Sequence, residues 1–170
     1  MRLATIFLTA LALASVAAAQ SAPMAGVAQS SPPGPGSPPS ALVLQDIPNA
    51  IQALVPAAQA SGSSGKTLAD YGSYKLQLSV RTSSGGAEVH AHWDDVMTVE
   101  TGSATLITGG TVIDGKTETD GETHGVKIDG GSSREIHPGD VLTIRAGTPH
   151  QLILKPGMVY GAVVVKIHEP

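Results

Sequence analysis

Two short segments, well separated in this chain of 170 residues, carry the residue types best suited to chemistry. The first is His90-Ala91-His92, and the second is residues 138–150, which end in a histidine. Side chains alternate across a strand, so two histidines two positions apart point to the same side. A histidine from a distant segment can close a metal site with them. The sequence therefore predicts a metal site formed by His90, His92 and His150.

The segments next to the histidine pair have the patterns of strands. Residues 75–81 alternate strictly between apolar and polar or charged positions, which is typical of a half-buried strand. After the histidines, Asp94 and Asp95 indicate a turn, and the β-branched run 96–100 indicates a returning strand. The histidine pair is thus expected between two strands.

A second pair of apolar segments surrounds the third histidine. Residues 141–144 and 151–154 flank the turn signals Gly147 and Pro149, and we expect them to form a hairpin. Alternation then puts His150 on one face with the two leucines that follow it. His150 is expected in an apolar wall.

At these residues the chain resembles the cupin superfamily, a group of small β-barrels with two motifs. In the first motif, an HxH pair is followed by a glutamate ligand and then by a glycine. His90 and His92 fit the pair, and Asp95 lies seven residues before Gly102, at the place of the family's glutamate. The resemblance thus implies Asp95 as the fourth ligand.

The second motif of the family is matched further along the chain. Gly139 and His150 have the family's separation, and Gly147 takes the place of the inner glycine. Arg145 and Leu154 replace the family's proline and asparagine. Two motifs in the right order, over roughly residues 70–168, are more specific than either alone. The resemblance implies an all-β fold, a single jelly-roll barrel.

The ligand set predicts a divalent transition metal. Three imidazoles and a carboxylate suit Fe, Mn, Ni, Zn or Cu, and the chain has no cysteine that would favour one of them. Asp95 is one methylene shorter than glutamate, so two other carboxylates remain alternatives as the fourth ligand. Asp94 is adjacent to it, and Glu88 shares the face of the histidine pair by alternation.

Arg145 is the candidate for substrate binding, because a guanidinium holds a carboxylate by paired hydrogen bonds. A solvated surface arginine is the alternative. The other histidines lack a partner at ligand spacing and are expected on the surface or satisfied in the core; they are His124, His137 and His168.

Two functional classes follow from the predicted site. One is a metal-dependent oxygenase, isomerase or hydrolase that acts on a small polar molecule, and the other is a non-catalytic barrel that binds such a molecule. The net charge is −4 and the basic residues are scattered along the sequence, so there is no basic cluster of the kind that binds nucleic acid. A homodimer is compatible with either class.

The residues before the barrel divide into three predicted parts. Residues 1–19 have the basic, apolar and small-residue regions of a signal peptide, which indicates export to the periplasm or the medium and no membrane span after cleavage. Residues 20–40 are rich in proline, serine and glycine and predict a disordered linker. Residues 41–69 predict a short helix, with Pro48 in its first turn, and a flexible connection at 61–65. The barrel is expected over 70–170.

Between the two motifs, residues 109–131 contain four glycine turn signals. We expect a polar insertion without regular structure. This insertion could form a lid over the mouth of the barrel, or it could be a solvent-exposed loop without a function; the sequence leaves both alternatives open.

Overall fold

The computed structural model describes residues 41–170. The predicted signal peptide and linker lie outside these residues. The described elements are α1 (Ile47–Gln52), α2 (Val55–Ser61), β1 (Ser63–Asp70), β2 (Tyr74–Arg81), β3 (Ala87–His90), β4 (Trp93–Thr101), β5 (Ala104–Thr108), β6 (Thr111–Ile113), β7 (Lys116–Thr117), β8 (Glu122–Gly125), β9 (Lys127–Asp129), β10 (Ser132–Ile136), β11 (Val141–Ile144), β12 (His150–Ile153) and β13 (Tyr160–His168). Neither described helix has the length and apolar character that a bilayer span needs.

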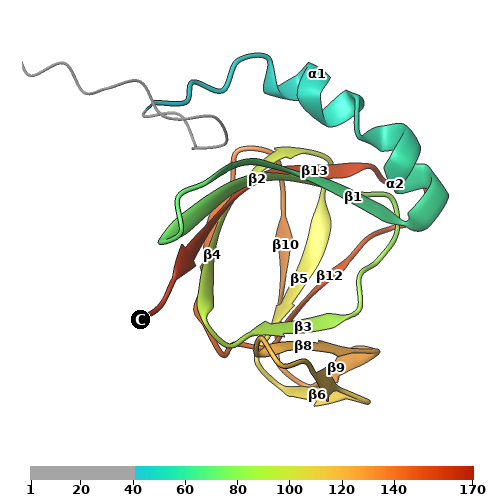
Figure 1. The fold of residues 1–170 in the computed structure, drawn as a ribbon. Helices are drawn as coiled ribbons and strands as arrows, with labels where there is room; N and C mark the ends of the chain where they lie inside the picture. Colours follow the sequence, from blue (N-terminus) through green and yellow to red (C-terminus); the bar gives the residue numbers. More distant parts are fainter. Residues whose placement is uncertain (1–40) are drawn as a thin grey trace, which may run out of the picture. The chain divides into compact units, whose positions relative to one another are not determined.

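Two antiparallel sheets face each other and form a barrel (Figure 1). The first has the strand order β1-β2-β13-β4-β11, and the second has the order β10-β5-β12-β3-β8-β7. From β2 to β5, and again from β10 to β13, consecutive strands alternate between the sheets. This topology confirms the predicted all-β jelly-roll barrel.

The alternation between sheets corrects two local expectations. Strands β11 and β12 do not form a hairpin, because β11 pairs with β4 and β12 pairs with β3 and β5. The bend lies at Ala91 and His92, within the histidine pair and not after it, so Asp94 and Asp95 belong to β4 instead of to a turn. Local propensity missed both because each strand finds its partners in a distant segment.

Strand β2 has its apolar face outside the barrel. Leu78 and Val80 are buried, and Val80 packs against Ile51 of α1 and Ala58 of α2. The polar residues that alternate with them face the barrel interior. The two helices therefore cover the outer face of the sheet, and the polar face of β2 is left for the interior of the barrel.

The region before the barrel is more regular than expected. The helical segment divides at Ala53 and Leu54 into two helices, each with a proline in its first turn. Pro56 lacks an N–H and would clash with the carbonyl of a preceding turn, so one helix cannot run through it. The flexible connection expected at 61–65 is instead largely the start of β1, where Gly65 pairs with Ser79 of β2. Backbone hydrogen bonds, which need no particular side chain, hold it.

Residues 109–131 are also structured, contrary to expectation. Strand β8 pairs with β3, β7 pairs with β8, and β6 and β9 form a separate two-stranded sheet. In Figure 1 these strands extend the barrel beside β3. The glycine turns connect short strands, and the segment extends a sheet edge next to the first histidine.

Candidate metal centre

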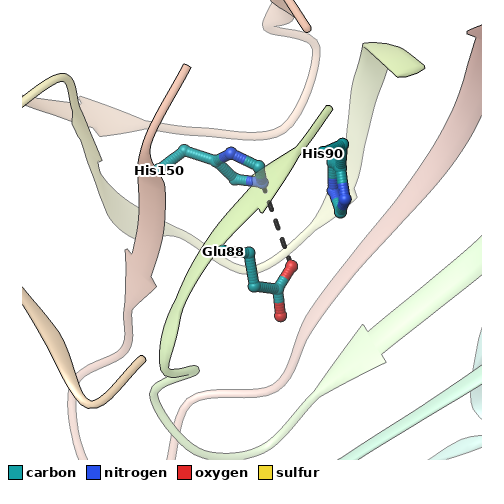
Figure 2. A group of neighbouring side chains, drawn as sticks. All are labelled: Glu88, His90 and His150. Carbon is teal, nitrogen blue, oxygen red and sulfur yellow. Dashed lines mark ion pairs between the residues drawn. The ribbon is translucent and has the colours of Figure 1, made fainter. Parts of the chain in front are cut away.

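Strand pairing brings two of the predicted histidines together with one carboxylate. Glu88 and His90 lie two positions apart on β3, and His150, the first residue of β12, pairs directly with Glu88. Their ligand atoms all lie within 4.8 Å of one another. Figure 2 shows the three side chains directed toward a common point. Glu88, one of the alternative carboxylates, thus joins His90 and His150.

Each histidine has one ring nitrogen already bonded to an acceptor. His150 Nδ1 donates to the carbonyl oxygen of Thr148 at 3.1 Å, and His90 Nδ1 bonds to the carboxylate of Glu122. A carbonyl or a carboxylate accepts, so Nδ1 carries the proton in both neutral rings. Such partners orient metal-binding histidines. In the neutral rings Nε2 keeps its lone pair, and only a protonated His90 donates from Nε2 to Asp95. The donor set of two imidazoles and a carboxylate therefore fits a divalent transition metal.

The electrostatics of the two histidines differ. For His150, burial dominates and lowers its pKa, which keeps the ring neutral. For His90, burial also acts to lower the pKa, but the hydrogen bonds to Asp95 and Glu122 outweigh it and raise the pKa above its usual value. Protons therefore compete with a metal more strongly at His90 than at His150.

Asp95 lies beside His90 but is bound to a cation. Its Oδ2 is 3.3 Å from His90 Nε2, and its Oδ1 accepts a hydrogen bond from Lys166 Nζ at 2.7 Å. Burial by itself would raise the pKa of Asp95, but the hydrogen bond from His90 and the positive charge of Lys166 together lower it. The residue predicted from the family motif is thus in the pocket but outside the cluster of three.

His92 is not brought into the cluster. Strand β3 ends at His90, two residues before His92, so the alternation that would place His92 on the same face does not reach it. His92 is exposed, and its ring lies 6.3 Å from that of His168, which also contacts Trp93. The structure puts this predicted ligand on the outer surface of the bend between β3 and β4.

Exposed Arg145 and buried Asp94 form an ion pair outside the lining of the cavity. The Arg145 side chain is 72% exposed, with its Nε 3.3 Å from Asp94 Oδ2 and an Nη2 contact to Glu169. Asp94 also accepts a hydrogen bond from the Ala146 amide at 2.7 Å. Asp94 therefore orders the turn before His150, and Arg145 does not reach the cavity. The remaining histidines are exposed, as expected; they are His124, His137 and His168.

A cavity of about 110 Å³ opens beside the cluster. Its wall combines the cluster with polar residues of β2 and with aliphatic residues; the lining is Gln77, Ser79, Arg81, Gly86, Glu88, His90, Asp95, Met97, Ile144, His150, Gln151, Leu152, Val164 and Lys166. Drug-sized ligand pockets start at roughly 300 Å³, so this one suits a molecule of few atoms.

Sequence reasoning missed three charged residues of the site. Arg81 and Lys166 line the cavity, and Glu122 bonds His90 from the segment expected to be a loop. The alternation of 75–81 carried a signal for Arg81, which shares the polar face of β2. Lys166 interrupts the apolar run of β13 and lies on the same inward face of the strand as Val164. No local pattern marks Glu122, because its role comes from the pairing of β8 with β3.

Solved structures of similar fold include several from bacteria. The polyketide cyclase RemF from Streptomyces resistomycificus is 20% identical, with a TM-score of 0.45, over 65% of this chain and 69% of that one. A cupin superfamily protein from Desulfitobacterium hafniense is 13% identical, with a TM-score of 0.43, over 63% and 78%. An uncharacterized conserved protein with a double-stranded beta-helix domain from Klebsiella pneumoniae is 15% identical, with a TM-score of 0.47, over 63% and 77%.

No protein-family model and no curated protein matches the chain. The two facing antiparallel sheets, with histidines on β3 and β12, define a jelly-roll β-barrel. This fold agrees with the superfamily that the two sequence motifs indicate.

Proposed function

We propose that this barrel holds a divalent transition metal through Glu88, His90 and His150 and binds a small polar molecule at that metal. The observation that carries the proposal is the convergence of three ligand atoms within 4.8 Å, from two histidines whose Nδ1 atoms are already engaged. When both rings are neutral, both Nε2 atoms have lone pairs available to one ion.

The residues of the pocket have separate tasks in this proposal. Glu122 and the Thr148 carbonyl hold the two rings, while aliphatic residues such as Met97 and Leu152 limit access of water. Three protein ligands leave coordination positions for a small molecule, and a bound divalent ion supplies Lewis acidity there. The cavity of about 110 Å³ restricts that molecule to a few non-hydrogen atoms.

Metal loading of protein purified without an affinity tag tests the proposal. After chelation and reloading with zinc, elemental analysis of the wild type is expected to show one ion per chain. The variant His150→Ala is expected to retain far less, because it loses a ligand, whereas His92→Ala is expected to match the wild type. Equal zinc in the wild type and in the double variant His90→Ala/His150→Ala contradicts the proposal.

A second candidate function is a small-molecule pocket that works without a metal. The observation in its favour is that the two carboxylates of the cavity already have cationic partners, Glu88 with Arg81 and Asp95 with Lys166. Such pairs stabilise buried carboxylates without an ion. Zinc content at background level in the reloaded wild type would support this function over the first.

We also propose that the protein is exported, on the basis of the basic, apolar and small-residue pattern of residues 1–19. N-terminal sequencing of protein from the exporting cell is expected to begin near Gln20. Protein that keeps Met1 and stays in the membrane contradicts this.

A further inference from the structure

One cation of the pocket is placed to bind an anion beside the metal cluster. We propose that Arg81, held flat by Gly85, binds the carboxylate of a small monoanionic ligand. The inference rests on the proposed function, because it identifies the ligand class of the same site. It also assigns to Arg81 the task that the sequence suggested for Arg145.

Arg81 reaches the cavity from the end of β2. Its side chain is 19% exposed, and its Nη2 donates to Glu88 Oε1 at 2.9 Å. Within residues 41–170 this is the one hydrogen bond of a group that has five N–H donors. The guanidinium therefore keeps donors available on the side of the cavity, which it lines together with the cluster.

Gly85 provides the surface on which the guanidinium rests. A Cβ atom at Gly85 would lie 2.6 Å from Arg81 Nη1 and 3.0 Å from Cζ, so any side chain there would displace the group. The backbone of Gly85 is itself held, because its amide donates to the Leu152 carbonyl at 3.0 Å. The plane of the guanidinium is thus set by contact with an anchored segment, which suits two-point recognition of a carboxylate.

The charges of the pocket favour a single negative charge on the ligand. Two cations, Arg81 and Lys166, stand against three carboxylates, Glu88, Asp95 and Glu122, in or against the cavity. With neutral imidazoles, two minus three leaves a formal charge of −1. A divalent ion at the cluster changes that charge to +1. An unbalanced charge in a partly enclosed pocket is unfavourable, so a monoanion is the ligand that restores neutrality.

Arg81 is better placed than Lys166 to bind that anion. The partner of Arg81 is Glu88, whose carboxylate belongs to the metal cluster, so an ion there draws charge away from Arg81. Lys166 is bonded at 2.7 Å to Asp95, which lies outside the cluster and keeps its charge for the lysine. The excess positive charge therefore falls on the arginine side of the pocket.

Calorimetric titration of zinc-loaded protein with propionate tests the inference, and propionamide serves as the neutral probe of similar shape. We expect the wild type to bind propionate and not propionamide. The variant Arg81→Gln is expected to weaken propionate binding by at least about tenfold, the usual value of a hydrogen bond to a charged group. Arg81→Lys keeps the charge but loses the planar fork, so a smaller loss is expected. Gly85→Ala displaces the guanidinium and is expected to weaken binding several-fold with every charge retained.

The matched control is Arg145→Gln, which removes the same charge from an exposed position outside the cavity and is expected to bind propionate as the wild type does. Zinc content of every variant is measured in parallel, and thermal melting confirms that each is folded. Wild-type affinity in Arg81→Gln with full zinc overturns the inference and leaves the proposed metal centre standing. Equal binding of propionamide also overturns it. A wild type that takes up no zinc overturns the metal centre, and with it the inference.

Discussion

Two carboxylates face the same pair of histidines from opposite sides of the cavity, and the structure uses them differently. Glu88, on the side of β3 and β12, is 28% exposed and contacts His150 and Arg81. Asp95, on the side of β4 and β13, is 7% exposed and is bonded to Lys166 at 2.7 Å. The more exposed and more loosely paired carboxylate is the one that joins the metal cluster. Proximity to a histidine alone does not make a carboxylate a metal ligand. The cation that competes for the carboxylate determines whether it is available to a metal.

The largest expected effect separates the two carboxylates as metal ligands. Glu88→Gln is expected to lower zinc affinity by about a hundredfold or more, because a neutral amide replaces a charged ligand. Asp95→Asn is expected to lower it by less than about tenfold, since Asp95 lies outside the cluster. Competition with a chromogenic chelator measures both affinities. If Asp95→Asn loses more zinc affinity than Glu88→Gln, the comparison is reversed, and Asp95 is the carboxylate ligand that the family motif implies.

Stability is expected to show the opposite order. Asp95→Asn leaves Lys166, whose side chain is only 20% exposed, without its charge partner, and we expect a loss of about 2 kcal/mol. Glu88→Gln is expected to cost less than about 1 kcal/mol, because Glu88 is 28% exposed and therefore better solvated than Asp95. Urea unfolding of chelator-treated protein measures the two losses. If the two variants lose equal stability, Asp95 has no greater structural role than Glu88.

A smaller effect concerns the residue that orients His90. Glu122→Gln keeps a hydrogen-bond acceptor but removes the charge that favours the Nδ1–H form, and it is expected to lower zinc affinity by about tenfold. Thr123→Ser, at the next position on β8, is the control and is expected to leave the affinity unchanged. If Glu122→Gln binds zinc like the wild type, β8 only covers the edge of β3.

The smallest effect is a pH dependence of stability on the Asp95 side. The pKa of Asp95 in the folded state lies below its ordinary value, because the hydrogen bond from His90 and the charge of Lys166 outweigh burial. Its contribution to stability is therefore fully present above the unfolded pKa and is lost as pH falls through the folded one.

Urea unfolding of chelator-treated protein between pH 5 and pH 3 measures this loss. We expect a steeper fall for the wild type than for Asp95→Asn, which lacks the titrating group. His90 interferes little in this range, because its raised pKa leaves it protonated in both states. Parallel curves for the two proteins would show that Asp95 gains nothing from its partners.

Much of the fold was readable from the sequence. The alternation of 75–81, the β-branched run 96–100 and the apolar run 141–144 all lie in observed strands, β2, β4 and β11. These predictions hold because a half-buried strand needs a period of two and little else. The pairing of strands could not be predicted, because the backbone hydrogen bonds that join partners such as β3 and β8 require no particular side chain.

The candidate site could be predicted only in part, because local patterns locate residues along the chain but do not show how the strands pair. The motifs located His90 and His150, whose spacing along the chain is a property of the sequence alone. The sequence expected His92 beside them, but β3 ends at His90, and a strand end depends on where the chain crosses to the other sheet. Arg145 was suggested because of its place in a motif, whereas the cavity contains Arg81. Arg81 faces inward because the helices cover the opposite, apolar face of β2.

The sequence by itself determined the class of barrel and the two histidines, because strand periodicity and motif spacing are local properties of the chain. The tertiary structure alone decided which carboxylate meets those histidines and which cation stands beside it. Glu88 and His150 become neighbours through the pairing of β3 with β12, and Asp95 is drawn to Lys166 by the pairing of β4 with β13. Residues far apart in the sequence acquire charge partners only when the sheets close, and those partners determine which of them remains available to a metal.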